Sequence, residues 1–262
     1  MHIAITGASS GIGATLAREL SSAGHSLTLV ARRKDLLDAL AKELGGKTHV
    51  VAHDLSDTSR ATEWIAAAEA ALGPIDVLVN NAGVQLVAPS ASLDPDEAER
   101  TIVVDLLAPL RLTRAVLPSM IARGNGVIVD VASQAALAPT PGMMHYNAAK
   151  AGLAAASESL RGELRGTGVH VVTVYPGIIP TTDMARASLD RYEETKLLGM
   201  FPRGTERILA VKIRRAIERR RDRVIYPASG AFGRWFPGTT RFLLDRFAPK
   251  LRALPASASP TA

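Results

Sequence analysis

The chain of 262 residues contains no cysteine, so it can form neither disulfides nor thiolate metal sites. Its six histidines show no metal-ligand spacing, and we predict no metal site. No run of residues reaches the ~18 apolar positions that a membrane-spanning helix needs. The first predicted strand begins almost at Met1, which leaves no room before the fold for a signal peptide or anchor. These absences favour a soluble, cytoplasmic protein.

Hydrophobic residues make up 47% of the chain, enough for the core of one domain of this length. Short apolar stretches alternate with helical ones, and this alternation predicts an α/β fold in a single domain, a doubly wound parallel sheet of the Rossmann type. The expected strands are residues 2–5, 27–31, 48–52, 76–79, 126–131, 169–174 and 223–226, and the main expected helices are residues 94–122 and 145–165.

A glycine-rich segment, TGASSGIG at residues 6–13, separates the first strand from a stretch with helical spacing of apolar residues. Gly7 permits a tight turn, Gly11 lets the backbone approach a phosphate, and Gly13 allows close helix packing. The start of the helix offers unpaired N–H groups to an anion. The spacing differs from GxGxxG, so a plain glycine-rich turn is the alternative interpretation.

Tyr146 and Lys150 are four residues apart in a predicted helix, so they lie one turn from each other on the same face. A phenol titrates near ~10, and ionising it near neutrality requires roughly 3 to 4 kcal/mol. One ammonium at ~5 Å supplies about that much at an effective dielectric of ~20. With Ser133 as a hydrogen-bond donor to a substrate oxygen, the set predicts an acid/base and an anchor. Taken alone, such a pair is more often a feature of a solvated helix.

Together, these motifs resemble those of the short-chain dehydrogenases/reductases over about residues 1–200. The resemblance rests on their order along the chain: TGASSGIG, Asp54, NNAG at residues 80–83, Ser133, YNAAK at residues 146–150, and Pro176-Gly177 followed by Thr181. It implies a nicotinamide cofactor, hydride transfer and a homo-oligomer, either dimer or tetramer.

The resemblance also implies a role for individual residues. Tyr146 would exchange a proton with the substrate oxygen, Lys150 would hold the nicotinamide ribose and lower the pKa of the tyrosine, and Ser133 would orient the substrate. The expected cofactor-binding residues are Gly7, Ser9, Ser10, Gly11, Ile12, Gly13, Arg32, Arg33, Asp54, Leu55, Asn80, Ala82, Gly83, Tyr146, Lys150, Pro176, Gly177, Ile179 and Thr181.

Asp105 departs from the family pattern, which has an asparagine in a water-linked proton relay to the lysine at this position. An ionised aspartate near Lys150 would offset part of the positive field on Tyr146 and raise the pH at which alcohol oxidation becomes efficient. Alternatively, Asp105 only braces the helix and accepts from the same water. We therefore count Asp105 among the candidate catalytic residues.

The second strand runs directly into Arg32-Arg33, with no acidic residue at its end. An acid there would hydrogen-bond the ribose diol of NAD, whereas an arginine welcomes the 2′-phosphate of NADP. The sequence thus predicts NADP (NADPH) as the cofactor. The alternative is that both arginines belong to a solvated helix start or that Arg32 stacks on adenine.

Beyond the catalytic motifs, residues 203–223 form a basic helical stretch, which is typical of a solvated face, and we predict no nucleic-acid partner.

We expect a catalytic domain at residues 1–226 with a substrate loop at about 178–205, a basic, aromatic extension at 227–254 and a disordered tail at 255–262. Four of the five phenylalanines lie in the extension, which packs on the domain or another subunit, or contacts an anionic membrane surface. The apolar residues of the loop form either a lid or ordinary packing positions, namely Met184, Leu189, Leu197, Leu198 and Met200.

The sequence as a whole predicts an NADP-dependent oxidoreductase that interconverts a carbonyl and an alcohol on a lipophilic small molecule. Two alternatives remain: a catalytically weak, NADP-binding regulatory protein of the same fold, favoured by Asp105, and a membrane-associating protein.

Overall fold

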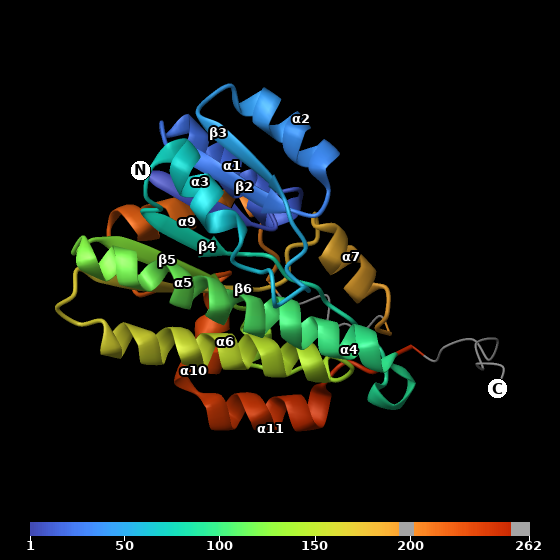
Figure 1. The fold of residues 1–262 in the computed structure, drawn as a ribbon. Helices are drawn as coiled ribbons and strands as arrows, with labels where there is room; N and C mark the ends of the chain where they lie inside the picture. Colours follow the sequence, from blue (N-terminus) through green and yellow to red (C-terminus); the bar gives the residue numbers. More distant parts are fainter. Residues whose placement is uncertain (194–201, 253–262) are drawn as a thin grey trace.

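A seven-stranded, entirely parallel sheet forms the centre of the computed structural model, which describes residues 1–193 and 202–252 (Figure 1). The strand order is β3-β2-β1-β4-β5-β6-β7. From the centre of the sheet, the strands run outward from β1 to β3 on one side and from β4 to β7 on the other, so the strand order reverses between β1 and β4. Open α/β sheets bind their ligands at such a switch point. The strands are β1 (His2–Thr6), β2 (Ser26–Ala31), β3 (Thr48–Ala52), β4 (Val77–Asn80), β5 (Gly126–Val131), β6 (Val169–Pro176) and β7 (Arg223–Tyr226).

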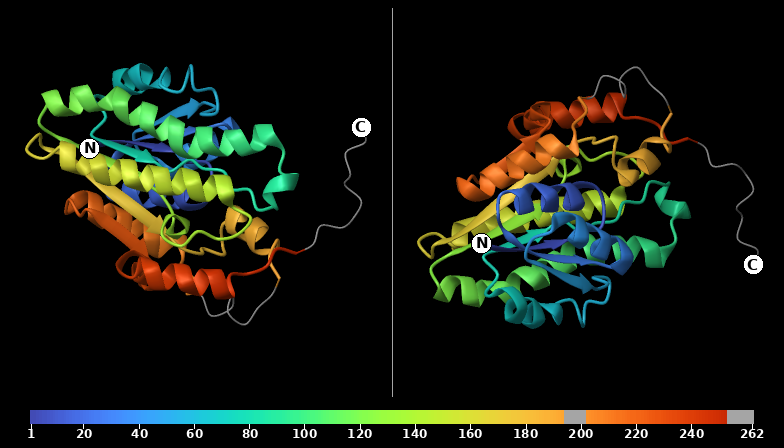
Figure 2. Two further views of the ribbon diagram at one scale, coloured as in Figure 1. Left: turned by 90° about the horizontal axis from the view of Figure 1, so that it is seen from below. Right: turned by 90° about the horizontal axis from the view of Figure 1, so that it is seen from above.

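Helices cover both faces of the sheet, so the predicted doubly wound α/β fold is confirmed (Figure 2). One face packs against α1 (Gly11–Ser22), α2 (Lys34–Leu44) and α9 (Glu206–Glu218). The other packs against α3 (Trp64–Leu72), α5 (Ala108–Ala122) and α6 (Met144–Glu163).

The alternation of side chains along β1 shows how the two hydrophobic cores are separated. Ile3 and Ile5 belong to the core under α1 and α9, whereas Ala4 between them belongs to the core under α3 and α5. All three side chains are fully buried because successive residues of a strand point to opposite faces and both faces carry helices. The near-continuous apolar runs of the sequence are the signature of this two-sided burial.

The stretch at residues 94–122 was predicted as one long helix, but it consists of three consecutive parts. Asp94 caps α4 (Pro95–Ile102) by accepting from the backbone N–H groups of Asp96 and Glu97. A π-helical turn, η2 (Val103–Leu107), then joins α4 to α5. Pro109 has no N–H to donate to the carbonyl of Asp105 four residues earlier, and its ring crowds that carbonyl. The turn therefore widens at Asp105, as π-bulges do at many functional sites.

Besides α9 and β7, the chain after β6 forms several smaller elements (Figure 1). These are α7 (Asp183–Leu189), the 3-10 turn η4 (Ala228–Gly230), α10 (Ala231–Trp235) and α11 (Pro237–Phe247), and two more 3-10 turns occur earlier, η1 (Ser90–Ser92) and η3 (Gln134–Ala136). The expectations for Leu197, Leu198, Met200 and the tail at residues 255–262 lie outside the described residues. Within residues 1–193 and 202–252, no helix is long and apolar enough to cross a membrane.

Candidate active site

A cavity of about 460 Å³ opens at the carboxyl ends of the strands, beside the switch point between β1 and β4. Loops that follow all of the first six strands contribute to its wall, because the carboxyl ends of parallel strands meet at one edge of the sheet. The predicted site residues in this wall are Gly7, Ser9, Ser10, Gly11, Ile12, Gly13, Arg32, Arg33, Asp54, Leu55, Ala82, Gly83, Ser133, Tyr146, Lys150, Pro176, Gly177 and Ile179.

The glycine-rich segment turns sharply from β1 into α1 and packs against the loop after β4. Gly7 has a φ of 67°, and a Cβ atom at this position would lie 2.7 Å from the Cα atom of Ala82. A Cβ atom on Gly13 would collide with the carbonyl oxygen of Gly7. The turn therefore needs glycine at both positions, and it brings the amino end of α1 to the cavity wall.

Thr6 joins this turn to the loop after β4 through its side-chain hydroxyl. The Oγ1 atom accepts from the backbone N–H groups of Asn81 and Ala82, each at 3.0 Å, and donates to the carbonyl of Val79 at 3.2 Å. The Nδ2 atom of Asn81 donates to the carbonyl of Thr6 at 2.8 Å. These bonds fix the two strand ends on either side of the switch point.

Arg33 stands beside the serines of the glycine-rich segment. Its Nη2 atom donates to Ser9 Oγ at 3.0 Å and to Ser10 Oγ at 2.8 Å. Arg32 also lines the cavity, next to it. Among the described residues of the cavity wall, these two cations and the serine hydroxyls make up a corner that suits a phosphate.

Tyr146 and Lys150 project from α6 into the same cavity, which Ser133 also lines. The ammonium of Lys150 lies 5.8 Å from the centre of the Tyr146 ring and donates to the carbonyl of Val131 at 3.0 Å. Ser133 Oγ accepts from the backbone N–H of Ala135 at 3.1 Å, and the same hydroxyl interacts with the phenol of Tyr146. The predicted acid/base, its neighbouring cation and the anchor are thus assembled at one point.

Asp105 forms an ion pair with Lys150 behind the cavity wall. Its Oδ2 atom lies 3.2 Å from the Nζ atom of Lys150, and both side chains are buried. Its Oδ1 atom accepts from the backbone N–H of Val84 at 2.7 Å. Gly83 lies against the pair, since a Cβ atom there would be 3.1 Å from Asp105 Oδ2.

Burial and this ion pair decide the ionisation of Tyr146. Burial raises the pKa of the phenol above its ordinary value, and the carboxylate of Asp105 adds to the rise. Lys150 and the hydroxyl of Ser133 lower the same pKa but do not outweigh the other two effects. Lys150 does favour ionisation, as expected from the sequence, yet the net direction is opposite because the spacing of residues does not reveal how deeply the phenol is buried.

The ammonium of Lys150 stays protonated at neutral pH. Burial, the largest single effect, lowers the pKa of Lys150, but Asp105, Tyr146 and Asp130 together raise it more, so the net pKa lies above its ordinary value. Burial raises the pKa of Asp105 above its ordinary value, and the opposing effects of Lys150 and the N–H of Val84 do not cancel this rise.

Three of the predicted site residues do not line the cavity. Asp105 acts from behind Lys150, and Asn80 is buried where its Nδ2 atom donates to Asp130 at 2.8 Å and to Thr113 at 3.1 Å. Asn80 therefore braces β4 against β5 and α5. The hydroxyl of Thr181 donates to Glu206, and the neighbouring Thr182 faces the cavity instead.

Sequence reasoning missed several residues of the cavity wall. Asn81 and Thr182 each adjoin a residue that was assigned, so the motifs located them to within one position. Arg100 and Leu244 carry no local signal, because they reach the wall only through the packing of α4 and α11. The missed residues with polar or large side chains include His53, Asn81, Gln85, Arg100, Gln134, Met143, Thr182, Tyr192 and Leu244.

The geometry agrees with comparisons to known proteins. Residues 1–193 match the family model described as short chain dehydrogenase. The chain belongs to this family. It is 39% identical to a short chain dehydrogenase of Pseudocercospora fijiensis over 67% of this chain and 58% of that protein. It is 34% identical to the ketoacyl reductase HetN of Nostoc sp. over 85% of this chain and 77% of that protein. It is 40% identical to a fatty acyl-CoA reductase of Mycobacterium tuberculosis over 70% of this chain and 65% of that protein.

Solved structures resemble this short-chain dehydrogenase over most of its length. A short-chain dehydrogenase from Streptomyces avermitilis superposes with a TM-score of 0.79 and 29% identity, covering 94% of this chain and 95% of that one. A metagenomic short-chain oxidoreductase in complex with NADP gives a TM-score of 0.65 and 36% identity, covering 72% and 88%. The chain thus has the fold of the short-chain dehydrogenase family, one of whose similar structures holds NADP.

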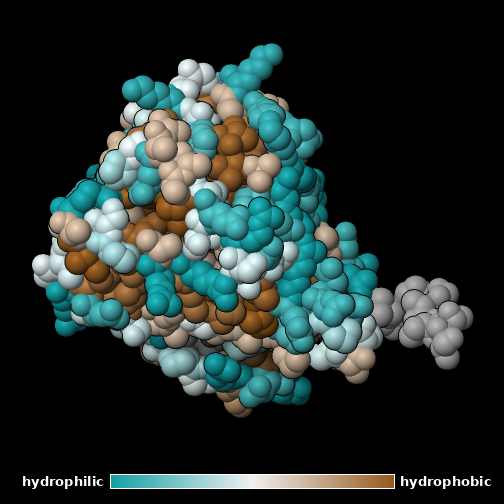
Figure 3. Space-filling model, in the orientation of Figure 1, coloured by the Kyte–Doolittle hydropathy of each residue, from teal (hydrophilic) through white to brown (hydrophobic). Residues whose placement is uncertain are grey.

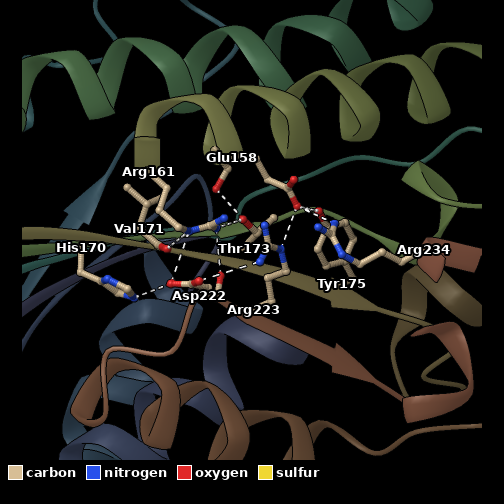
Figure 4. A network of polar contacts seen from close by, with 10 residues as sticks. Glu158, Arg161, His170, Val171, Thr173, Tyr175, Asp222, Arg223 and Arg234 are labelled. Atoms are coloured by element: carbon tan, nitrogen blue, oxygen red, sulfur yellow. Dashed lines mark hydrogen bonds and ion pairs between the residues drawn. The ribbon is translucent and has the colours of Figure 1, made fainter. Parts of the chain in front are cut away.

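Helix α6, which carries Tyr146 and Lys150, also anchors the carboxyl-terminal extension. Glu158 lies on α6, and its Oε1 atom accepts from Arg223 of β7 at 2.9 Å, from Arg234 of α10 at 2.7 Å and from Tyr175 of β6 at 3.0 Å (Figure 4). Burial raises the pKa of Glu158, but these bonds outweigh it and lower the pKa to about 2. One ionised carboxylate therefore holds together α6, the sheet edge and the extension.

Proposed function

We propose that the protein is an NADP-dependent oxidoreductase that interconverts a carbonyl and an alcohol on a lipophilic small molecule. The observation that carries this proposal is the convergence of Tyr146, Lys150 and Ser133 on one cavity whose other end holds Arg33 and the glycine turn. In this reaction the glycine turn would bind the nucleotide, whereas Tyr146, Lys150 and Ser133 would move the proton. Both groups are needed, and both line the same cavity.

The residues present fit the cofactor. A Cβ atom would fill the cradle at Gly7 and Gly13, and the start of α1 has no acidic residue that would repel a pyrophosphate. Arg33, held by Ser9 and Ser10, would receive the 2′-phosphate together with Arg32. Asp54 and Leu55 would border the adenine, and Lys150 the nicotinamide ribose. When bound, NADPH supplies a hydride to the carbonyl carbon of the substrate.

Tyr146 acts as the proton donor in the reducing direction. Because burial and Asp105 raise its pKa, the phenol keeps its proton at neutral pH and can give it to the developing alkoxide. Ser133 donates a hydrogen bond to the same oxygen, and the buried ammonium of Lys150 stabilises the tyrosinate that remains. In the oxidising direction the phenol must lose its proton first, which requires a more alkaline solution.

The end of the cavity beyond Tyr146 supports a lipophilic substrate. Its wall includes Met143, Met184, Leu189 and Leu244, with Tyr192 beside them. Met184 and Leu189 lie on α7, so the lid interpretation of the substrate loop is favoured for these two residues. Relatives named as ketoacyl and fatty acyl-CoA reductases point to acyl carbonyl compounds as the first class to assay.

Turnover tests this function directly. NADPH oxidation is measured with a panel of acyl, aromatic and terpenoid aldehydes and ketones, with NADH in parallel. We expect NADPH consumption that the Tyr146→Phe variant lacks. NADPH binding without turnover on any member of the panel would contradict the proposal and favour a regulatory role.

That regulatory role is the second candidate, and the Asp105 to Lys150 ion pair favours it. The carboxylate neutralises the cation that should promote proton transfer at Tyr146. If the regulatory role is correct, the protein binds NADP and converts any carbonyl substrate only slowly. A large gain in turnover in the Asp105→Asn variant would separate a weakened enzyme from one adapted to the aspartate.

We also propose that the protein is a homo-oligomer that uses the face formed by α5 and α6. Hydrophobic residues gather on this face of the molecule (Figure 3). Leu110 and Ile121 of α5 are more than two-fifths exposed, and a shallow groove runs between the two helices. Sedimentation velocity measures the assembly state, and a monomer at assay concentrations would contradict this proposal.

A further inference from the structure

The outer side of α10 and α11 carries large apolar side chains that the described parts of the chain leave exposed. We call this set the aromatic surface: Phe232, Trp235, Phe236, Phe242, Leu243 and Phe247. Trp235 is 73% exposed and Phe242 67%. Aromatic residues make up only 4% of the whole protein. Their concentration on one outer edge indicates a surface that binds something.

The orientation of this surface is fixed by contacts on its inner side. Thr240 of α11 is buried, and Leu244 one turn later reaches the cavity wall. Arg234 holds α10 to Glu158, and Gln134 holds the start of the extension through a bond of 2.9 Å from its Nε2 atom to the carbonyl of Pro227. Rotation of α11 to bury Phe242 would expose Leu244 and Thr240, so the aromatic side chains face outward.

The charge of the extension indicates whether a second copy of the protein or an anionic bilayer binds to the aromatic surface. Residues 227–252 contain five basic residues, Arg234, Arg241, Arg246, Lys250 and Arg252, and a single acidic one, Asp245. A second copy docking on itself through this surface would bring like charges together. An anionic bilayer would instead receive the aromatic rings at its interface while Arg241 and Arg246, both exposed, contact its headgroups.

We propose that the aromatic surface docks this protein on anionic lipid bilayers, with α10 and α11 lying in the interface. Leu244 of α11 and Pro249, two residues after the end of that helix, also line the catalytic cavity. The docked cavity therefore opens beside the membrane surface, and a lipophilic substrate exchanges with the bilayer without crossing bulk water. This last step rests on the proposed function, whereas the docking itself does not.

Flotation of the full-length protein with vesicles tests the docking without cofactor or substrate. The vesicles consist of phosphatidylcholine alone or of phosphatidylcholine mixed with phosphatidylglycerol. We expect binding to the anionic vesicles only, weakened by salt. The triple variant Trp235→Ser, Phe242→Ser and Phe247→Ser should bind these vesicles at least about tenfold more weakly than the wild type, because it removes the apolar area that enters the interface.

A matched control changes exposed apolar residues elsewhere. The Leu36→Ser and Ile208→Ser variant, which changes exposed residues of α2 and α9, should float like the wild type. Circular dichroism verifies that each variant is folded, and NADPH binding, which none of these residues serves, should be unchanged in all. Turnover of a short, water-soluble carbonyl compound by the triple variant then separates the two proposals, because loss of docking leaves it intact.

Three results would overturn the docking. The wild type fails to float with anionic vesicles, or the triple variant floats as well as the wild type. The third such result is a light-scattering measurement in which the triple variant has a smaller assembly than the wild type. This result would identify the aromatic surface as an interface between copies of the protein.

Discussion

The Oδ2 atom of Asp105 lies 3.2 Å from the Nζ atom of Lys150, and neither side chain is exposed to solvent. An ion pair formed at the surface would have little effect on a neighbouring phenol, since water screens it. This pair is buried beside Tyr146, where the field of each charge is felt strongly. Burial is the main cause of the raised pKa of Tyr146, and Lys150 and Asp105 then change that pKa in opposite directions.

The Asp105→Asn variant should shift the pH–rate profile of alcohol oxidation to lower pH, by about one unit. The carboxylate raises the pKa of Tyr146, so its removal lowers that pKa and makes tyrosinate available at a lower pH. The profile of kcat/KM against pH measures the shift. The control is Glu97→Gln, an exposed acid on α4, which should leave the profile in place. An unmoved profile for Asp105→Asn would remove Asp105 from proton transfer.

The Tyr146→Phe variant should lose about 10² to 10⁴ in kcat while retaining NADPH affinity to within about threefold, because it deletes the acid and keeps the ring. Ser133→Ala should lose less, since one neutral hydrogen bond to the substrate oxygen is removed. Fluorescence titration with NADPH and steady-state rates check both quantities. Comparable rates for Tyr146→Phe and wild type would assign the proton to another donor.

The fold was predictable because its determinants are local. Each strand is an apolar run bounded by polar residues or glycine, and the expected and observed bounds of β3, β5 and β7 coincide. The alternation of such runs with helices leaves few topologies open. The break inside residues 94–122 was missed because apolar spacing continues through η2, and only the absent N–H of Pro109 marks the change of helix type.

The candidate site was predictable where a motif carries it. Tyr146 and Lys150 belong to one helix turn, so their spacing determines their proximity. Arg33 and Ser10 meet only because β2 pairs beside β1, and the sequence therefore could not decide whether Arg32 or Arg33 holds the glycine-rich segment. The net pKa of Tyr146 depends on burial by several elements at once, which no spacing reveals. Leu244 lies more than 90 residues beyond Tyr146, and the sequence did not reveal it as a cavity residue because only the packing of α11 places it in the wall.

The Glu158→Gln variant should be less stable than the wild type at neutral pH, by about 1 to 2 kcal/mol after allowance for solvent screening. The folded state lowers the pKa of Glu158 from its ordinary value of 4.5 to about 2. A lowered carboxyl pKa contributes stability that is complete above the unfolded pKa and disappears as the pH falls through the folded one. The difference between the two proteins should thus be constant above about pH 5 and shrink between 4.5 and 2.

Urea denaturation at several pH values measures that difference. Glu163→Gln is the matched control, because Glu163 ends the same helix and is exposed. Its effect on the urea midpoint should be small at every pH. A difference for Glu158→Gln that persists unchanged at pH values near 2 would show that packing, and not the charge, stabilises this junction.

The Arg33→Ala variant should bind NADPH about 10- to 100-fold more weakly and NADH nearly unchanged. The Nη2 atom of Arg33 lies at hydrogen-bond distance from Ser9 and Ser10, so its charge is held beside the turn where a 2′-phosphate would bind, and NADH has no such phosphate. Lys34→Gln is the control, since that neighbouring cation pairs with Asp38 on α2 and does not line the cavity. Isothermal titration with both cofactors measures the ratio. Because only the loss of a phosphate contact discriminates between them, equal losses for NADPH and NADH would mean that Arg33 merely braces the turn, and the preference for NADP would then have to come from Arg32.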